Sequence, residues 1–480
     1  MSIDRLVVVG GSLAGLRAVE AARKAGFSGS VTLIGAEEHL PYDRPPLSKA
    51  YLEVLEGGAE PEKPYFRSDD VYSEELDVEL MLGRPATGLD TVRRVVTVGG
   101  EFEVGYDALV IATGAAVRHI PGTQHLEGVF GLRTLDDSIG VRAALDAGAR
   151  TVVIGAGFIG SEVASGANKR GVEVTIVEAL PTPLVRATGK QMGAAIAALH
   201  ERNGTTLRCG TGVAAIEGDG RVERVVLDDG TVIPADLVVV GIGVAPCVEW
   251  LEGSGLTVDN GIVCDANLWT GAPGVYAAGD VANWVNPVFG IRQRMENWTA
   301  AAEQGAAAAR NALDPENAKP YGTVPYFWSD WYDVRIQFVG LPDADEVVLV
   351  DGDTDQDGRW VALYRQGDRL IGALTVNGQT EIMKYRVLIS KGATWQEGLD
   401  HAAKRHALAA EKAAAAAQAQ CPPNRGSRQE SFLEVGDSVL EVDQHALEVG
   451  ESPPVADDAD VHAVVVAGHC DVGGLAFGDE

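Results

Sequence analysis

Two copies of one glycine-containing pattern constrain the fold of this 480-residue chain more than any other feature. Each copy has a short apolar run, a glycine-rich turn, a helix-compatible stretch and a second apolar run, at residues 4–36 and again at residues 151–179. A strand, a glycine turn and a helix in this order begin a crossover between parallel strands, with a dinucleotide site at the helix N-terminus. We therefore expect an α/β fold with two Rossmann-like dinucleotide-binding domains.

In the first copy, Gly10, Ser12 and Gly15 occupy the positions of a GxGxxG motif, with serine in place of the second glycine. The first glycine makes the tight turn, a small second residue lets a pyrophosphate approach the backbone, and the third allows close helix packing. Glu37 ends the next strand, where a carboxylate can bind ribose hydroxyls. A degenerate glycine motif alone is also typical of a structural turn, but strand, helix and acid together favour a nucleotide site.

The second copy has the full motif, with Gly155, Gly157 and Gly160, and Glu178 stands at the end of its next strand. A carboxylate there accepts hydrogen bonds from a 2′-hydroxyl and repels a 2′-phosphate, so the pattern favours NADH over NADPH. Arg186 follows soon after and could still contact a phosphate, so NADPH is disfavoured rather than excluded.

Charge and hydropathy exclude two classes of partner. The formal net charge is −30, and both nucleic acid and anionic membranes bind cationic surfaces. The first residues lack the pattern of a signal peptide, and no apolar run approaches the roughly 20 residues that span a bilayer. We expect a cytoplasmic protein that binds neither nucleic acid nor membrane.

The cysteines have no CxxC or CxxxxC spacing, and the nearest pair is 17 positions apart. Neither a thiolate metal site nor a redox-active cysteine pair is therefore expected. The five residues are Cys209, Cys247, Cys264, Cys421 and Cys470.

The order of strand-like segments suggests that the second domain interrupts the first. We predict a discontinuous first domain at residues 1–116 and 245–320, and an inserted second domain at 117–244. After Pro325 the sequence becomes rich in aromatic and β-branched residues, which predicts a small α+β domain at 321–400 with antiparallel strands.

Residues 401–480 differ from the rest of the chain. They begin with an alanine-rich, helix-prone stretch, and residues 421–480 then hold 13 acidic and 2 basic side chains. Three seven-residue repeats start at Leu433, Leu440 and Leu447, but their glycines and single apolar position favour a flexible acidic tail or a short β segment over a coiled coil.

Several longer segments carry a specific resemblance: PYDRPPLSK (41–49), ATGA (112–115), LRTLDD (132–137), GAGFIGSEVA (155–164), VGIGVAP (240–246), VYAAGDVA (275–282), ENWTAAAEQG (296–305) and PYFWSD (325–330). Over roughly residues 3–400 the chain resembles the single-FAD ferredoxin, rubredoxin and putidaredoxin reductases of oxygenase systems, which are relatives of apoptosis-inducing factor. The resemblance implies a nested, glutathione-reductase-like arrangement of FAD and NAD(P) domains with a small C-terminal domain.

The resemblance also implies roles for individual residues. It places Lys49 near the reactive N5 edge of FAD and pairs it with Glu162 beside the nicotinamide. The other residues implied at FAD are Gly10, Ser12, Gly15, Glu37, Arg44, Thr113, Gly114, Asp280 and Trp298, and those at NADH are Gly155, Gly157, Gly160, Glu178 and Gly243. Read without the family, Lys49 would be a solvated loop residue and Glu162 an exposed helix carboxylate.

The implied function is an NADH:ferredoxin or NADH:rubredoxin reductase of the ferredoxin–NAD(+) reductase type. Hydride passes from NADH to FAD, and electrons then pass singly to a small iron–sulfur protein that feeds a P450 or Rieske oxygenase. Because ferredoxins are usually acidic, we expect a basic docking patch at Arg292, Arg294 and Arg335, although each could also be an ordinary surface arginine. The protein is expected to be a monomer or homodimer without a metal site.

Two alternatives remain open from the sequence. The first is an NADH oxidase or peroxidase, although such enzymes generally need a reactive cysteine near the flavin and residues 1–208 contain no cysteine. The second is a redox-sensing interaction factor of the apoptosis-inducing-factor type. Three departures from the family pattern are Thr182 for arginine, Cys247 for asparagine and Trp331 for glutamine.

Overall fold

The structure is a computed structural model that describes residues 3–55, 57, 59–356 and 358–420. Residues up to Gln418 belong to one compact unit, and a second unit begins at Ala419. The predictions made for the acidic tail and its repeats lie outside the described residues.

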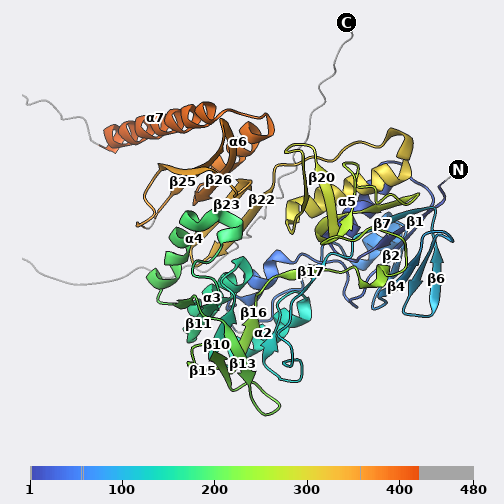
Figure 1. Cartoon of the computed structure of the whole chain (residues 1–480), viewed down its shortest axis with the longest axis horizontal. Coiled ribbons are helices and arrows are strands. Elements are labelled where there is room, and N and C mark those ends of the chain that lie inside the picture. Colours follow the sequence, from blue (N-terminus) through green and yellow to red (C-terminus); the bar gives the residue numbers. More distant parts are fainter. Residues whose placement is uncertain (1–2, 56, 58, 357, 421–480) are drawn as a thin grey trace, which may run out of the picture. The chain divides into compact units, whose positions relative to one another are not determined.

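The first sheet is parallel and has the order β19-β7-β1-β2-β3. All of its strands except β3 are buried over nearly their whole length, which suits apolar runs covered on both faces. Helices α1 (Leu13–Lys24) and α5 (Trp298–Leu313) pack against each other, and α5 lies beside β7 (Figure 1). The strands are β1 (Arg5–Val9), β2 (Ser30–Ile34), β3 (Val78–Met81), β7 (Ala108–Ile111) and β19 (Val275–Ala277).

The close approach of α1 and α5 depends on a small residue. A Cβ at Gly305 would lie 2.1 Å from the Ala14 carbonyl oxygen, so only glycine fits where the two helices meet. The pairing of β19 with β7 confirms that the chain returns to the first sheet near residue 275, as the sequence predicts.

The second sheet repeats this design with the order β12-β11-β10-β16-β9, and all its strands are parallel. Helix α2 begins with a capping box in which Thr134 and Asp137 each accept a backbone N–H. The strands are β9 (Val129–Phe130), β10 (Thr151–Ile154), β11 (Val174–Glu178), β12 (Thr206–Cys209) and β16 (Leu237–Val240), and the helices are α2 (Leu135–Asp146), α3 (Phe158–Lys169) and α4 (Val185–Arg202).

Each parallel sheet is accompanied by a three-stranded antiparallel meander, and a two-stranded and a further three-stranded sheet complete this part of the chain. The strands β8 and β17 form a two-stranded antiparallel ribbon where the chain leaves and re-enters the first half. These strands are β4 (Ala86–Asp90), β5 (Val95–Val98), β6 (Phe102–Gly105), β8 (Ala115–Val117), β13 (Val213–Glu217), β14 (Arg224–Leu227), β15 (Val232–Pro234), β17 (Val244–Pro246), β18 (Ile262–Val263), β20 (Ala282–Asn286) and β21 (Ile291–Arg294).

The C-terminal sheet is antiparallel with the order β22-β23-β26-β25-β24, as the aromatic and β-branched runs predict. Helix α6 packs on β26 and β23 (Figure 1). The elements are β22 (Tyr326–Trp331), β23 (Val334–Gly340), β24 (Glu346–Asp351), β25 (Trp360–Gln366), β26 (Arg369–Val376), α6 (Gln379–Ser390) and α7 (Trp395–Gln420).

A buried carboxylate ties α7 to this sheet. Glu381 on α6 is 4% exposed and pairs with Arg359 and, at 2.8 Å, with Arg405 on α7. Burial alone would raise the pKa of Glu381, but the hydrogen bonds and charges of the two arginines lower it.

The predicted α/β fold class is confirmed, with two parallel sheets and an α+β C-terminal part. The alanine-rich stretch is helical within α7, as predicted. The exact domain boundaries at residues 116, 244, 320 and 400 stay a prediction.

Candidate functional site

The first glycine turn joins β1 to α1, and it has no room for a Cβ at Gly10 or Gly15. Gly10 has a φ of +127°, and a Cβ there would lie 2.0 Å from the Ala112 carbonyl oxygen. A Cβ at Gly15 would lie 1.9 Å from the Gly10 carbonyl oxygen. At the helix start, Ser12 makes no side-chain capping bond to any described residue of α1. The backbone N–H groups of this turn are therefore suited to a pyrophosphate.

Arg44 joins the predicted acid to this turn. Its guanidinium donates to Glu37 at 2.7 Å and to the Ser12 hydroxyl at 3.3 Å. The Tyr42 hydroxyl also donates to Glu37, at 2.5 Å. The structure thus brings three sequence-predicted residues together and adds Tyr42, which lies in the PYDRPPLSK segment but was not predicted as a site residue.

Thr113, Gly114 and Asp280 lie at neighbouring strand ends of the first sheet. The Thr113 hydroxyl donates to the Cys247 carbonyl at 2.9 Å, and the Cys247 N–H donates to the Gly114 carbonyl at 3.0 Å. Asp280 forms an ion pair of 2.9 Å with Arg133. Arg133 belongs to the LRTLDD segment, yet only the three-dimensional arrangement identifies it as the cation beside Asp280.

Cys247 is the cysteine associated with this region, and its environment is that of an unreactive thiol. Burial raises the pKa of the Cys247 thiol, assisted by the negative charge of Glu249. A protonated thiol is a poor nucleophile at neutral pH. Cys209, Cys247 and Cys264 are all free in the described chain.

The second glycine turn joins β10 to α3 with the same geometry. Gly155 has a φ of +99°, and its Cβ would lie 2.4 Å from the Gly241 carbonyl oxygen. A Cβ at Gly160 would lie 2.3 Å from the Gly155 carbonyl oxygen. Gly157 is the N-cap of α3, and Gly243, with a φ of +95°, follows β16 near the same strand ends. This turn also fits a pyrophosphate.

Glu178 lies at the end of β11, where the sequence predicts a ribose ligand. Its two carboxylate oxygens accept the N–H of Ala156 at 2.9 Å and of Leu180 at 2.8 Å. The first of these bonds joins the carboxylate directly to the glycine turn. A negative charge in this position opposes a 2′-phosphate.

Lys49 and Glu162 form an ion pair of 2.7 Å, as the resemblance implies. Lys49 follows the short 3₁₀ helix Pro45–Ser48, and Glu162 lies on α3 just after the second glycine turn. Their side chains are 19% and 4% exposed. Hydroxyl groups of Ser48 and Ser329 donate to the same carboxylate. The pair therefore joins the segment beside the first turn to the helix of the second turn.

The N-terminus of α5 is held by an acid that sequence reasoning missed. The Trp298 indole N–H donates to Asp43 at 2.7 Å. Burial raises the pKa of Asp43, opposed by this indole and by the charge of Lys49. Trp328 on β22 lies edge-on to Trp298, with ring centroids 6.1 Å apart.

The three arginines predicted to dock a partner have different environments. Arg335 is 37% exposed, lies over the Trp328 ring at 5.9 Å and pairs with Asp330 at 3.5 Å. Arg292 donates to two backbone carbonyl groups. Arg294 is only 10% exposed and is paired with Glu296 at 2.7 Å, which leaves little of its side chain for a partner.

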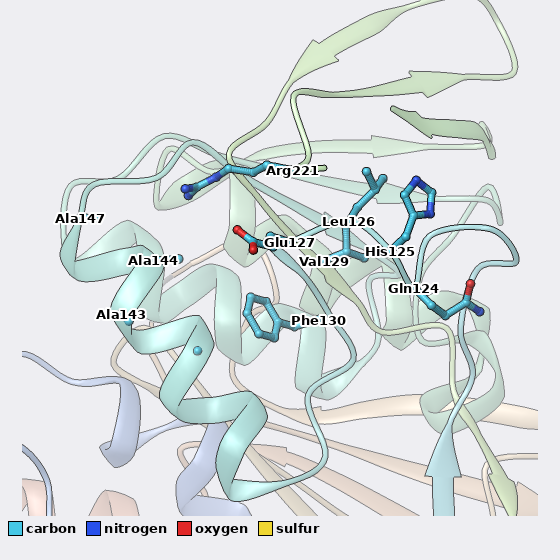
Figure 2. A pocket seen from close by; sticks show the side chains of 12 residues that line it. Gln124, His125, Leu126, Glu127, Val129, Phe130, Ala143, Ala144, Ala147 and Arg221 are labelled. Atoms are coloured by element: carbon cyan, nitrogen blue, oxygen red, sulfur yellow. The ribbon is translucent and has the colours of Figure 1, made fainter. Parts of the chain in front are cut away.

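A separate cavity of about 610 Å³ lies between the edge strand β9 and helix α2 (Figure 2). The Phe130 ring faces α2, and Glu127 and Arg221 stand above it. None of the predicted site residues is among the described residues that line this cavity, so it is not the nucleotide site.

Two absences apply to the described residues alone. Among residues 3–55, 57, 59–356 and 358–420, acidic, cysteine and histidine side chains form no group able to hold a metal ion. Within the same residues, no helix is long and apolar enough to cross a membrane.

Comparison with known proteins covers most of the described chain. Residues 4–305 match the family model described as "Pyridine nucleotide-disulphide oxidoreductase", and residues 326–408 match "Reductase C-terminal". Rhodocoxin reductase of Rhodococcus erythropolis is 36% identical over 80% of this chain and 89% of its own. The anthranilate 1,2-dioxygenase system ferredoxin–NAD(+) reductase component of Burkholderia cepacia is 37% identical over 82% of this chain and 96% of its own.

A solved structure gives the same result for the fold. The crystal structure of the covalent putidaredoxin reductase–putidaredoxin complex matches with a TM-score of 0.76 and 34% identity, covering 82% of this chain and 94% of that one. The cofactors predicted from the sequence, FAD and NAD(H), are those of this family.

Proposed function

Because the chain belongs to the pyridine nucleotide-disulphide oxidoreductase family, we propose that it is an FAD-containing NADH reductase whose electron acceptor is a ferredoxin or rubredoxin-like iron–sulfur protein. The named relatives support this acceptor, since they include a dioxygenase-system ferredoxin reductase and a reductase in complex with putidaredoxin. The iron–sulfur protein would in turn feed an oxygenase. We place this activity in the cytoplasm.

The observation that carries the proposal is the Lys49–Glu162 pair. It connects the segment after Arg44, which contacts the first glycine turn, with the helix that begins at the second turn. With a nucleotide bound at each turn, the Lys49–Glu162 pair would lie between the segment that binds the first nucleotide and the helix that binds the second. This arrangement suits alignment of two reactive rings.

The residues of the first turn fit FAD. Gly10, Ser12 and Gly15 would hold the pyrophosphate, Glu37 a ribose, and Asp280 the chain that leads to the flavin. When bound, FAD accepts two electrons together and releases them singly. The uncapped start of α5 at Trp298 would stabilise negative charge on the flavin.

The residues of the second turn fit NADH. Gly155, Gly157 and Gly160 would receive the pyrophosphate, and Glu178 would accept hydrogen bonds from the adenosine ribose. Glu162 would lie beside the nicotinamide. Its charge is balanced by the Lys49 ammonium, which offsets the cost of burying a carboxylate.

The family name refers to disulphide substrates, but this chain has no described thiol pair to carry electrons. Direct transfer from the flavin to a protein acceptor is therefore favoured. We propose that Arg335 and the Trp328 ring below it form the docking surface, with Arg292 as a second candidate. Arg294 is the weakest of the three predicted docking residues because its side chain is nearly buried.

The function is tested with purified holoprotein, NADH and a [2Fe–2S] ferredoxin, with cytochrome c as the final acceptor. We expect ferredoxin-dependent cytochrome c reduction and a preference for NADH over NADPH. Fast ferricyanide reduction without any ferredoxin reduction, accompanied by oxygen consumption, would support an NADH oxidase instead. Slow NADH oxidation with a long-lived charge-transfer complex would support the redox-sensing alternative.

The docking surface is tested by Arg335→Glu, with Arg224→Glu as the matched control. Arg224 is 46% exposed and also ion-paired, but it lies on β14 in a different sheet. Only Arg335→Glu should raise the KM for ferredoxin and reduce its salt dependence, while ferricyanide reduction stays unchanged in both variants. Equal effects of the two substitutions would reject this surface.

A further inference from the structure

The Glu162 carboxylate accepts hydrogen bonds from two serine hydroxyls in addition to its ion pair with Lys49. One oxygen accepts from Ser48 and lies 2.7 Å from the Lys49 ammonium, while the other accepts from Ser329 of β22. Glu162, Ser48 and Ser329 are all buried. Each oxygen of this buried carboxylate is thus satisfied by a neutral hydroxyl in addition to the ion pair, as a desolvated charge requires.

Trp331 fixes the direction in which Ser329 donates. The indole N–H of Trp331 donates to the Ser329 hydroxyl oxygen at 2.8 Å. A serine hydroxyl has one hydrogen, so the oxygen that accepts from Trp331 directs its hydrogen to Glu162. Both residues are completely buried.

The Trp331 ring is itself held in place. It stacks on His200 with ring centroids 4.8 Å apart and an angle of 24° between the planes. His200 bonds to the Tyr332 hydroxyl at 2.8 Å and to the Ser161 hydroxyl at 3.1 Å. Ser161 directly precedes Glu162 on α3. The contacts that lead from Glu162 through Ser329, Trp331 and His200 to Ser161 therefore begin and end on the same turn of this helix.

We propose that Ser329 and Trp331 are positioning residues for the Lys49–Glu162 pair, so that the C-terminal sheet sets where the Lys49 ammonium lies in the nucleotide site. This inference rests on the proposed function, which puts that pair between FAD and NADH. The rigid ring of Trp331 supplies this N–H without a flexible side chain. Loss of the Ser329 hydroxyl would leave one Glu162 oxygen without a donor, and Glu162 would turn and take Lys49 with it.

The first test compares Ser329→Ala with Ser165→Ala. Ser165 is the matched control because its buried hydroxyl accepts the Tyr332 N–H at 2.5 Å, at the same junction of α3 and β22, and is not one of the donors to the Glu162 carboxylate. In stopped-flow mixing with NADH and no acceptor protein, Ser329→Ala should slow FAD reduction at saturating NADH about tenfold, as misalignment predicts. The control should stay near the wild-type rate, and Ser329→Thr, which keeps the hydroxyl, should restore it.

The second test reads the position of Lys49 without turnover. The reduction potential of bound FAD is measured by reductive titration with dithionite, so NADH is not needed. A cation near the flavin stabilises its reduced form, so the potential should fall in Ser329→Ala and in Trp331→Phe, which keeps the stacked ring. Ser165→Ala should leave the potential unchanged. In a Glu162→Gln background, Ser329→Ala should have no further effect.

The inference is overturned if Ser329→Ala and Ser165→Ala give the same rates and potentials, since the hydroxyl would then serve only the packing of the junction. This outcome is distinct from failure of the proposed function. A wild-type protein that reduces no iron–sulfur protein would refute the acceptor, and yet the potentials would still show whether Ser329 acts through Glu162.

Discussion

Acidification should weaken the fold through His200. The side chain is completely buried, and burial lowers its pKa from 6.5 to about 4. In the unfolded chain the imidazole takes up a proton near pH 6.5, but in the folded protein it stays neutral to about pH 4. His200 therefore lowers stability progressively as the pH falls from 6.5 to 4. At pH 4.5 this linkage amounts to about 2.5 kcal/mol relative to pH 7.5.

The assay compares the wild type with His200→Gln by urea titration, followed by tryptophan fluorescence because Trp331 stacks on His200. Glutamine keeps hydrogen-bonding groups but cannot take up a proton. At pH 7.5 the wild type should be the more stable protein. At pH 4.5 its advantage over the variant should be smaller by about 2.5 kcal/mol and could reverse.

A matched control makes the same chemical change at an exposed position, His125→Gln. The reasoning is refuted if the difference in unfolding free energy between wild type and His200→Gln is the same at both pH values. It is equally refuted if His125→Gln reproduces the pH dependence of His200→Gln.

Three further substitutions have defined outcomes. Gly155→Ala would put a Cβ 2.4 Å from a backbone carbonyl oxygen and should abolish NADH binding, measured calorimetrically, while the absorbance of bound FAD persists. Glu178→Ala should lower the ratio of kcat/KM for NADH to that for NADPH by about tenfold, and an unchanged ratio would contradict its role. Glu381→Gln should destabilise the fold by about 2 kcal/mol at pH 7, because Arg359 and Arg405 lose their anion. Since the pKa of Glu381 is lowered in the fold, the wild-type advantage in unfolding experiments should disappear as the pH falls below 4.5.

The sequence predicts those features of the site that depend on local backbone geometry. Gly10 and Gly155 can be recognised from the sequence because a turn with positive φ and no space for a Cβ accepts hardly any residue except glycine. Glu178 is visible because strand length fixes its distance from the turn. The parallel sheets follow from buried apolar runs of about five residues.

Contacts between distant segments could not be predicted in the same way. Ser329 and Glu162 are separated by 167 positions, and neither residue type indicates the other. The sequence places Arg133 in the LRTLDD motif, but its ion pair with Asp280 depends on how distant segments meet in the fold. For Arg294, the sequence predicts a docking residue from its charge, and only the fold shows that its side chain is 10% exposed.

The ribbon of β8 and β17 makes the segment of residues 118–243 separable in principle. Val117 pairs with Val244 across this ribbon, so the two ends of the intervening segment are neighbours, roughly 5 Å apart for paired antiparallel residues. A short turn could therefore replace residues 118–243 without stretching the strands on either side. The resulting chain should still close the first sheet and retain FAD without binding NADH.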